Sequence, residues 1–521
     1  MIDLKEWDID TQVCEEVEMQ KNPFSSNRNW LINNKYFLKA SNHDFEKQTK
    51  LLRRLLGRGL PVLAPYMWKT VEKGGYYFQL YDYIPQNMSR IDYEKEEYAS
   101  KIADILSKFS KQDADDMLNL REDTMKVLSL LSTEDPDILS VVNKALAQLE
   151  ENLFVFLVYF EKRFSHGDFH PLNILWENNK IKAIIDFEVA GKREELYDLA
   201  FLIGCVGMDN PNELQNKWIK TLLTEYVKLA QPTKLAYELL PELIIATRLR
   251  WLVIWLSSSR DKKIAKMETK FISIILKHIE QFRRLWISYA GDFLYSKKNW
   301  VMQDAYIVHD IEKAKKRTEN IDIFNPKIIS DKQAEELSTD LRLLAIDFGM
   351  KNDIISVLKI LKTQKKLSEE HDLAHVNMEY SVTMGNSSLD FNKFRLVCGL
   401  KELVRNYEEL LKNNPHEEEL RMGFSFILRN SSIQMAEIGN YEKAFEFVDK
   451  QMLLAELYPQ IEIFGELART LSNAITSSIS ENFDKHELYW QKLKKLYEEH
   501  PKSRKIEVAY KVAKTNLKKF T

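Results

Sequence analysis

The chain has 521 residues, of which 45% are hydrophobic and 29% charged, and its formal net charge is -3. Such a length exceeds what one hydrophobic core usually supports, so we expect two or three domains. The nearly balanced charge argues against nucleic acid or a membrane surface as the main partner. Three widely spaced cysteines, no secretory signal and no uninterrupted apolar stretch of membrane-spanning length predict a cytoplasmic protein.

The first eighty-five or so residues read as strands around one helix. Short aromatic and β-branched runs flank the turn-forming pairs Asn33-Asn34 and Gly74-Gly75, which predicts two hairpins. Apolar residues at helical spacing predict a helix over Phe45–Leu56 between them. We assign residues 1–86 to one mainly β lobe. Its predicted strands are Arg28–Asn33, Lys35–Lys39, Trp68–Val71 and Tyr76–Tyr81.

Residues 87–300 form a second, mainly helical lobe in this interpretation. The exception is Phe164–Glu188, where two short β-like runs flank the turn Glu177-Asn178-Asn179. Apolar stripes at helical spacing indicate the helices around this segment. These stripes cover Ile102–Phe109, Trp218–Leu229, Leu240–Leu256 and Phe271–Trp286.

A loose repeat characterises residues 301–521. Pro415, Pro459 and Pro501 are spaced by 44 and 42 residues, and each precedes a helical stretch. The segment Ala436–Ala444 resembles the inter-helix turn of a tetratricopeptide repeat, although this period is longer than the 34 residues of that family. We predict an all-α solenoid of helix pairs over Asn325–Thr521; an irregular helical bundle is the alternative.

Two short motifs carry most of the chemistry in this sequence. The first is HGDFHPLNIL, which contains Asp168 and Asn173, and the second is IDFE, which begins at Ile185 and contains Asp186. Transfer of a γ-phosphoryl group needs an acceptor hydroxyl held in line and a divalent metal that screens the phosphate oxygens. Asp168 is placed to accept or orient the hydroxyl proton, while Asn173 and Asp186 offer the oxygen ligands that Mg²⁺ prefers.

Each of these residues also has a purely structural interpretation. A single aspartate or asparagine in a loop is usually a turn residue or a helix cap. His166 and His170 are candidate metal ligands, but a hydrogen bond to loop backbone is the more common role for a histidine such as His166. The joint spacing of the aspartate, the asparagine five residues later and the second aspartate thirteen residues beyond favours the catalytic interpretation.

The two motifs resemble the catalytic and metal loops of the superfamily of aminoglycoside phosphotransferases, choline kinases and homoserine-kinase-like enzymes, which are relatives of protein kinases. The resemblance covers roughly residues 10–290 and implies an α+β, two-lobed, protein-kinase-like fold with ATP between the lobes. Protein kinases have His-Arg-Asp and Asp-Phe-Gly at these places. Gly167 and Glu188 replace the arginine and the last glycine here, which favours the small-molecule branch.

The resemblance also implies roles for residues outside the two motifs. Lys39 matches the third-strand lysine that neutralises the α- and β-phosphates, with an ordinary strand-end lysine as the alternative. Asp82 and Ile84 match the hinge whose backbone meets the adenine edge. Asp198 matches an aspartate at a helix start that braces the catalytic loop.

The sequence departs from the family pattern in its nucleotide-binding half. Gln48 occupies the place of the helix glutamate that pairs with the lysine, and Glu46 lies roughly 200° around the helix from it. Either Gln48 makes a neutral hydrogen bond to Lys39, or a local shift brings Glu46 in. The phosphate-covering loop, Lys21–Arg28, contains no glycine.

We therefore expect an ATP- and Mg²⁺-dependent kinase that phosphorylates a hydroxyl of a small amino alcohol, sugar, aminoglycoside or amino acid. Ala246–Trp251 and Trp255 either line the acceptor pocket, with an arginine for a carboxylate or phosphate, or form the core and solvated faces of a helix. An acidic cluster with aromatics, the usual mark of a cation site, is not evident. The alternatives are a nucleotide-sensing binding protein and a kinase for a protein recruited by the helical repeats.

Overall fold

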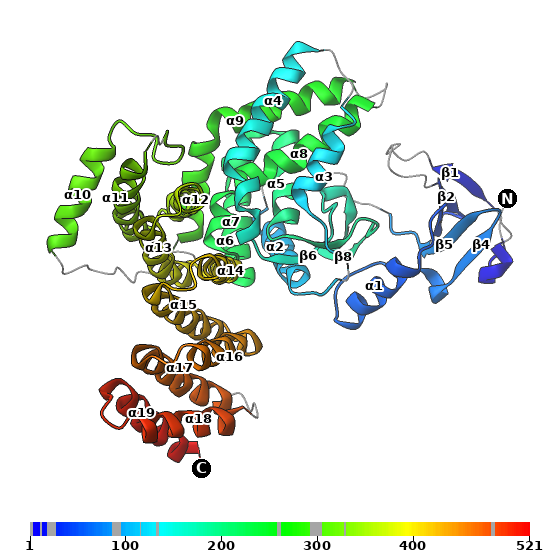
Figure 1. Ribbon diagram of the computed structural model, residues 1–521. Coiled ribbons are helices and arrows are strands. Elements are labelled where there is room, and N and C mark those ends of the chain that lie inside the picture. The colour runs from blue at the N-terminus through cyan, green and yellow to red at the C-terminus, as the bar shows by residue number, and fades with distance from the viewer. Residues whose placement is uncertain are drawn as a thin grey trace. The chain divides into compact units, whose positions relative to one another are not determined.

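A computed structural model describes residues 4–10, 13–17, 28–85, 95–114, 116–131, 135–257, 262–291, 305–327, 330–480 and 485–520. The chain divides into two compact units, Met1–Tyr295 and Ser296–Thr521. The first combines antiparallel sheets with helices, and the second is a series of packed helices (Figure 1). Within the described ranges, no helix combines the length and the apolar character that crossing a membrane requires.

The first unit begins with an antiparallel five-stranded sheet of order β1-β2-β3-β5-β4. Asn33, Asn34, Gly74 and Gly75 all have positive φ, as two-residue hairpin turns of this kind require, so both predicted hairpins are confirmed. The first strand was not predicted, because it offers only four mostly exposed residues. The strands are β1 (Cys14–Val17), β2 (Arg28–Ile32), β3 (Tyr36–Ser41), β4 (Thr70–Lys73) and β5 (Tyr76–Asp82), and short 3₁₀ turns cover Leu4–Trp7 and Tyr66–Trp68.

The predicted helix between the hairpins is present as α1 (Glu46–Gly57), which buries Leu52 and Leu55. The chain that follows α1 then pairs with the helical lobe. Val62 forms a parallel bridge with Ile184, whose amide donates to the carbonyl of Pro61 at 2.6 Å. The segment that precedes Asp186 is therefore hydrogen-bonded to the sheet lobe.

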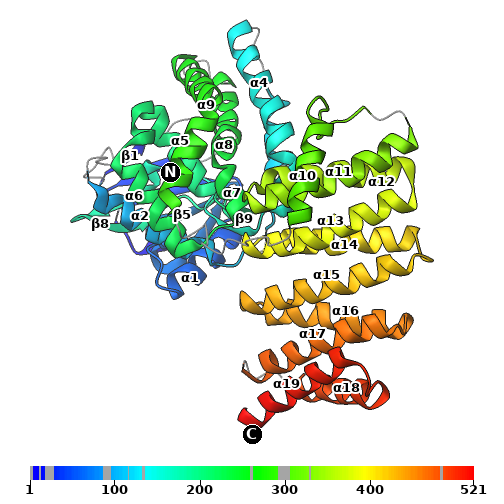
Figure 2. The same ribbon diagram turned by 90° about the vertical axis from the view of Figure 1, so that its left-hand side faces the viewer.

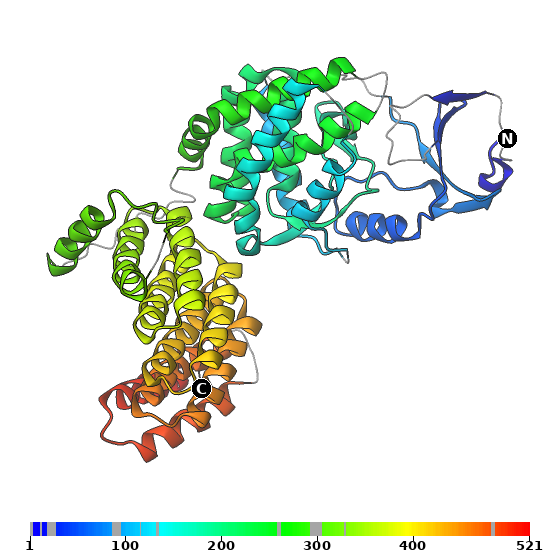
Figure 3. The same cartoon turned by 45° about the horizontal axis from the view of Figure 1, so that its top comes forward.

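The helical lobe is built around α8 (Leu240–Ser257), which packs against the helices α3, α4, α5 and α9 (Figures 1 and 3). Four short strands form two separate antiparallel pairs, one of which is the hairpin predicted around Glu177–Asn179. The strands are β6 (Lys162–Ser165), β7 (Ile174–Glu177), β8 (Lys180–Ile184) and β9 (Gly191–Glu194); β6 pairs with β9, and β7 with β8. The remaining helices are α2 (Glu96–Ser110), α3 (Leu120–Leu128), α4 (Pro136–Asn152), α5 (Tyr197–Asp209), α6 (Lys217–Ala230), α7 (Lys234–Glu238) and α9 (Lys262–Ala290), with 3₁₀ turns at Phe154–Tyr159, Pro171–Asn173 and Pro211–Gln215.

The second unit consists of helix pairs that recur along the chain. The first helices of the pairs, and the final helix, begin at residues 331, 374, 418, 461 and 504, so their starts are 43 or 44 residues apart. Each of these helices packs against the next one of the set, and Figure 2 shows them stacked in chain order. The helices are α10 (Ala305–Thr318), α11 (Asp331–Met350), α12 (Ile354–His371), α13 (Ala374–Lys393), α14 (Val397–Asn413), α15 (Glu418–Glu437), α16 (Tyr441–Leu457), α17 (Ile461–Ser480), α18 (His486–Glu499) and α19 (Arg504–Phe520).

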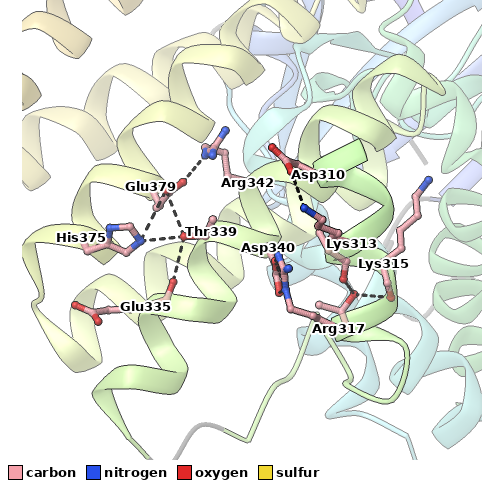
Figure 4. Close-up of polar contacts among 12 residues, drawn as sticks. Asp310, Lys313, Lys315, Arg317, Glu335, Thr339, Asp340, Arg342, His375 and Glu379 are labelled. Atoms are coloured by element: carbon pink, nitrogen blue, oxygen red, sulfur yellow. Dashed lines mark hydrogen bonds and ion pairs between the residues drawn. The ribbon is translucent and has the colours of Figure 1, made fainter. Parts of the chain in front are cut away.

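Ion pairs join neighbouring helices at the start of this unit. Arg317 of α10 pairs with Asp340 of α11, with 3.0 Å between Nε and Oδ2, and Arg342 of α11 pairs with Glu379 of α13 (Figure 4). A corresponding pair, Arg429–Glu466, joins α15 to α17. Each of its residues lies 87 residues after its counterpart in Arg342–Glu379, which is two repeat periods.

A second polar contact recurs at the same interval of 87 residues. Gln364 of α12 donates to the carbonyl of Ser338 at 3.1 Å, and Gln451 of α16 donates to the carbonyl of Ser425 at 3.0 Å. Because buried amides and carbonyls need partners, these contacts fix the register of each pair. The recurrence therefore extends from helix boundaries to individual side chains.

Two glycines in this unit give a matched test of helix packing. A Cβ at Gly423 would overlap the hydroxyl of the fully buried Tyr407, whereas a Cβ at Gly385 would meet only Phe426, at an ordinary 3.8 Å. We expect Gly423→Ala to destabilise the protein by about 1–3 kcal/mol through overpacking. Gly385→Ala should instead stabilise it by roughly 0.5–1 kcal/mol, because alanine is the better helix former. The melting temperature of each variant is measured by calorimetry on the full chain. A shift in the same direction for both variants would contradict this packing.

Candidate active site

The loop that follows β6 is held by one carboxylate at the start of α5. Asp198 accepts hydrogen bonds from the Ser165 hydroxyl at 2.7 Å and from the backbone amides of His166 and Gly167 at 2.7 and 2.9 Å. A carboxylate with several such donors fixes a loop strongly, since charge-assisted hydrogen bonds are about twice as strong as neutral ones. Asp198 thus makes the contacts expected of a bracing residue.

Gly167 is required by the backbone at this point. Its φ is +82°, and a Cβ here would overlap the carbonyl oxygen of Val189. The loop therefore passes directly against the segment between Asp186 and β9. The glycine that stands here in place of the arginine of protein kinases thus has a steric basis in this fold.

His166 has a structural role in this site. Its ring is completely buried, Nε2 donates to the carbonyl of Ile185 at 2.8 Å, and Nδ1 accepts from the amide of Asp168 at 3.3 Å. Burial lowers the pKa of His166 and keeps the imidazole neutral. Since both ring nitrogens are used, this histidine is no metal ligand here, and it ties the two loops together instead.

The three residues of the predicted catalytic set lie around one cavity of about 770 Å³. Asn173 donates through Nδ2 to the backbone carbonyl of Asp168 at 2.9 Å and to its carboxylate at 3.4 Å. Asp186 follows β8 with a φ of 70° and lines the same cavity. Lys39 and Gln48 are also in the lining. The structure brings these five residues together, while their roles in chemistry remain predictions.

Lys39 reaches this cavity from the middle of β3 and is only 12% exposed. Its ammonium lies 2.8 Å from Oδ1 of Asp186 and also pairs with Glu188. Burial acts to lower the pKa of Lys39, but the two carboxylates raise it overall. Burial likewise acts to raise the pKa of Asp186, but the ammonium of Lys39 lowers it overall.

Neither expectation for the partner of Lys39 on α1 is correct. Glu46 pairs with Lys50 on the exposed side of the helix, and no hydrogen bond between Gln48 and Lys39 is present among the described residues. The physical reason is that Asp186 and Glu188 already satisfy the ammonium. Glu188 was missed as a partner because it lies in a turn that follows the positive φ of Asp186, where no strand or helix periodicity predicts the direction of a side chain.

The hinge and the covering loop are only partly described. Asp82 ends β5 and pairs in register with Tyr36, and Ile84 follows two residues later, but of this segment it is Tyr81 that lines the cavity. Residues 21–27 of the predicted phosphate-covering loop lie outside the described ranges. Arg28, at the end of that loop, lines the cavity and pairs with Glu16 at 2.9 Å.

The two arginines of α8 have different environments. Arg248 is 4% exposed and pairs with Glu268 of α9, with 2.7 Å between Nε and Oε1, so it belongs to the core. Arg250 and Trp251 line the cavity. Two alternatives were open for Ala246–Trp251. Arg248 belongs to the core of the helical lobe, whereas Arg250 lines the cavity.

Comparison with known proteins finds one family model that matches part of the first unit. Residues 23–238 match the model of the phosphotransferase enzyme family. This stretch contains the five-stranded sheet from β2 onward, both loops of the cavity and the helices as far as α7. A long helical region follows it. A search of the curated proteins found no match.

Solved structures with a distant similarity to this chain include aminoglycoside phosphotransferases and a choline kinase. An aminoglycoside 2'-phosphotransferase IIIa mutant in its GDP complex is 14% identical, with a TM-score of 0.40 over 54% of this chain and 97% of that one. A choline kinase from Streptococcus pneumoniae is 17% identical, with a TM-score of 0.40 over 52% and 94%. A mutant aminoglycoside phosphotransferase with ADP and hygromycin B is 11% identical, with a TM-score of 0.39 over 53% and 96%.

The Lys39 pair predicts a specific pH dependence of stability. The folded-state pKa of Asp186 lies below its ordinary 3.8, so its carboxylate stabilises the fold above that pH, and the contribution is lost as the pH falls through the folded pKa. In Lys39→Met, desolvation acts without the ammonium and raises that pKa, so the carboxylate of Asp186, 36% exposed, no longer stabilises the fold at neutral pH. We expect the difference in Tm between wild type and variant to be largest near pH ~7 and to shrink toward pH ~5.

The control for this experiment is Lys50→Met, which removes an exposed ammonium paired with Glu46 on α1. Exposed pairs of this kind contribute little to the stability of a protein. A Tm difference for Lys39→Met that stayed constant from neutral to acidic pH would show that Asp186 is not held ionised by Lys39.

Gly167→Ala tests the close approach of the two loops. The variant has to place an alanine in a left-handed conformation, which costs about 1–2 kcal/mol, and must also move the Val189 carbonyl away. We expect a lower Tm and weaker nucleotide-dependent thermal stabilisation. Gly57→Ala, at a position with no atom within 4 Å of the added Cβ, is the matched control and should leave both measurements nearly unchanged.

Proposed function

We propose that this chain is an ATP- and Mg²⁺-dependent phosphotransferase that moves the γ-phosphate to a hydroxyl of a small molecule. The observation that carries the proposal is the joint lining of one cavity by Lys39, Asp168, Asn173 and Asp186. These residues come from β3, from the loop after β6 and from the loop after β8. The family match over residues 23–238 supports the same chemistry.

The donor atoms in this cavity suit Mg²⁺. Asp186 offers a carboxylate, and the hydrogen bonds of Asn173 run through Nδ2, which leaves its amide oxygen as a neutral ligand. Magnesium takes hard oxygen ligands and often needs only one or two from the protein, because nucleotide phosphates and water supply the others. When bound, it would screen the charge on the transferring phosphate.

Asp168 is the residue that would accept or orient the proton of the acceptor hydroxyl. Its side chain is 23% exposed, lines the cavity and is held by Asn173 on one side. Nε2 of His170 lies 3.6 Å from the same carboxylate oxygen, Oδ2, that Asn173 contacts. Lys39 would bind phosphate oxygens in place of part of its present pairing with Asp186 and Glu188.

A nucleotide-sensing protein without transfer activity is the second candidate, and Gln48 is the observation that favours it. The neutral amide provides no carboxylate for Lys39 from α1. Glu188 provides one from the other loop, however, so the lysine is held without α1.

We also propose that the helical series after residue 301 is a solenoid with a surface for a protein partner, because stacked helix pairs commonly present such surfaces.

The deciding experiment is Asp168→Ala with ADP release as the readout. Loss of a residue that takes a proton in the transition state typically lowers the rate by about 10²–10⁴-fold. We expect this loss over a panel of hydroxylated small molecules, while Mg·ATP still raises the Tm. Asp104→Ala, which removes an exposed carboxylate paired with Lys108 on α2, should leave turnover unchanged.

Two results would count against the proposal. Unchanged turnover in Asp168→Ala would remove this residue from the chemistry. Absence of ADP release from the wild type with every acceptor, together with retained Mg·ATP binding, would favour the nucleotide-sensing protein.

A further inference from the structure

The cavity contains three cationic side chains, and two of them have anionic partners. Lys39 pairs with Asp186 and Glu188, and Arg28 pairs with Glu16. Arg250 also lines the cavity, but it forms no ion pair with any residue in the described part of the chain.

The anionic side chains of the cavity are distributed differently. Those of Glu16, Asp186 and Glu188 each contact one of the two paired cations. Asp168 is then the only lining carboxylate, among the described residues, without a lysine or arginine partner. A cationic ligand would therefore find one carboxylate, which is already the residue assigned to the acceptor hydroxyl.

Arg250 is presented to the cavity by the register of α8. Ile254 lies one turn further along the helix on the same side, and Trp251 lies about 100° around from Arg250; all three line the cavity. Arg250 is only partly exposed. A partly desolvated guanidinium attracts oxyanions, which it can bind through two parallel hydrogen bonds.

The wall around Arg250 adjoins the catalytic loop. The ring of Trp251 lies 6.1 Å from that of Phe201 in α5, and Phe201 lies 6.4 Å from the ring of His170. His170 in turn contacts Asp168, at 3.6 Å. This series of contacts connects Trp251, the neighbour of Arg250 on α8, to the proposed proton acceptor, and Arg250 and Asp168 line the same cavity.

From this arrangement, and resting on the proposed function, we infer that the phosphoryl acceptor is an anionic hydroxylated small molecule. Its carboxylate or phosphate binds the guanidinium of Arg250, and its carbon skeleton lies against Trp251. Ile254 extends the apolar part of this surface. The positive charge of Arg250 would repel cationic acceptors such as polycationic aminoglycosides and choline.

The test compares ligands that share a skeleton and differ in charge. One set is glucose, glucosamine, glucuronate and glucose 6-phosphate, and the other is glycerol, glycerate and glycerol 3-phosphate. Binding to the full chain loaded with Mg²⁺ and a non-hydrolysable ATP analogue is measured by titration, with ADP release from Mg·ATP measured in parallel. In at least one set we expect an anionic member to bind at least tenfold more tightly than its neutral counterpart. The carboxylate and phosphate members distinguish the two kinds of oxyanion.

Variants of α8 assign the preference to its residue. Arg250→Met should reduce anion binding to the level of the neutral ligand, and Arg250→Lys should retain part of it as a point charge without the planar fork. Arg284→Met, on the exposed side of α9, is the control and should bind like the wild type.

The titration separates this inference from the proposed function. Equal or weaker binding of every anionic ligand, or an anion preference that survives in Arg250→Met, would overturn the inference even if ADP release showed an active kinase. An anion preference that depends on Arg250 would support it even if no ADP were released, in which case the proposed transfer activity alone would fail.

Discussion

A buried ammonium group must have anionic partners, and in this protein that requirement sets the geometry between the sheet and the two loops of the cavity. Lys39 leaves β3 with little exposure and finds its partners in Asp186 and Glu188, which follow β8. The same segment is hydrogen-bonded to the chain after α1 through Ile184. The lysine, the strand bridge and the positive φ of Asp186 therefore depend on one another. Removing the cation leaves two partly exposed carboxylates side by side without their partner.

The parts of the fold that could be predicted are those that local sequence determines. Asn33-Asn34 and Gly74-Gly75 dictate their turns because few residues tolerate positive φ, and the α1 region has apolar residues at helical spacing. The close spacing of Asp168 and Asn173 on one loop likewise survives in the structure. These predictions need no knowledge of distant contacts.

The errors and omissions concern pairings between distant segments. The partner of Lys39 was sought on α1 because the family pattern places it there, whereas Glu188, about 150 residues along the chain, provides the charge. Arg248 and Arg250 are two residues apart and indistinguishable by composition, yet one pairs with Glu268 and the other faces the cavity. Only the packing of α8 against α5 and α9 separates them.

Two side-chain contacts of the C-terminal helices, Arg342–Glu379 and Gln364–Ser338, have counterparts 87 residues further along the chain, although the helices themselves recur every 43 or 44 residues. Arg342 and Arg429 therefore mark equivalent interfaces, and between α13 and α15 the polar contacts come instead from Asn430 and Gln434, which donate to Ser388. A deletion of four helices would superimpose Arg342 on Arg429 and Gln364 on Gln451, so these two contacts would keep their partners. A deletion of one helix pair would shift both contacts out of register by 43 or 44 residues.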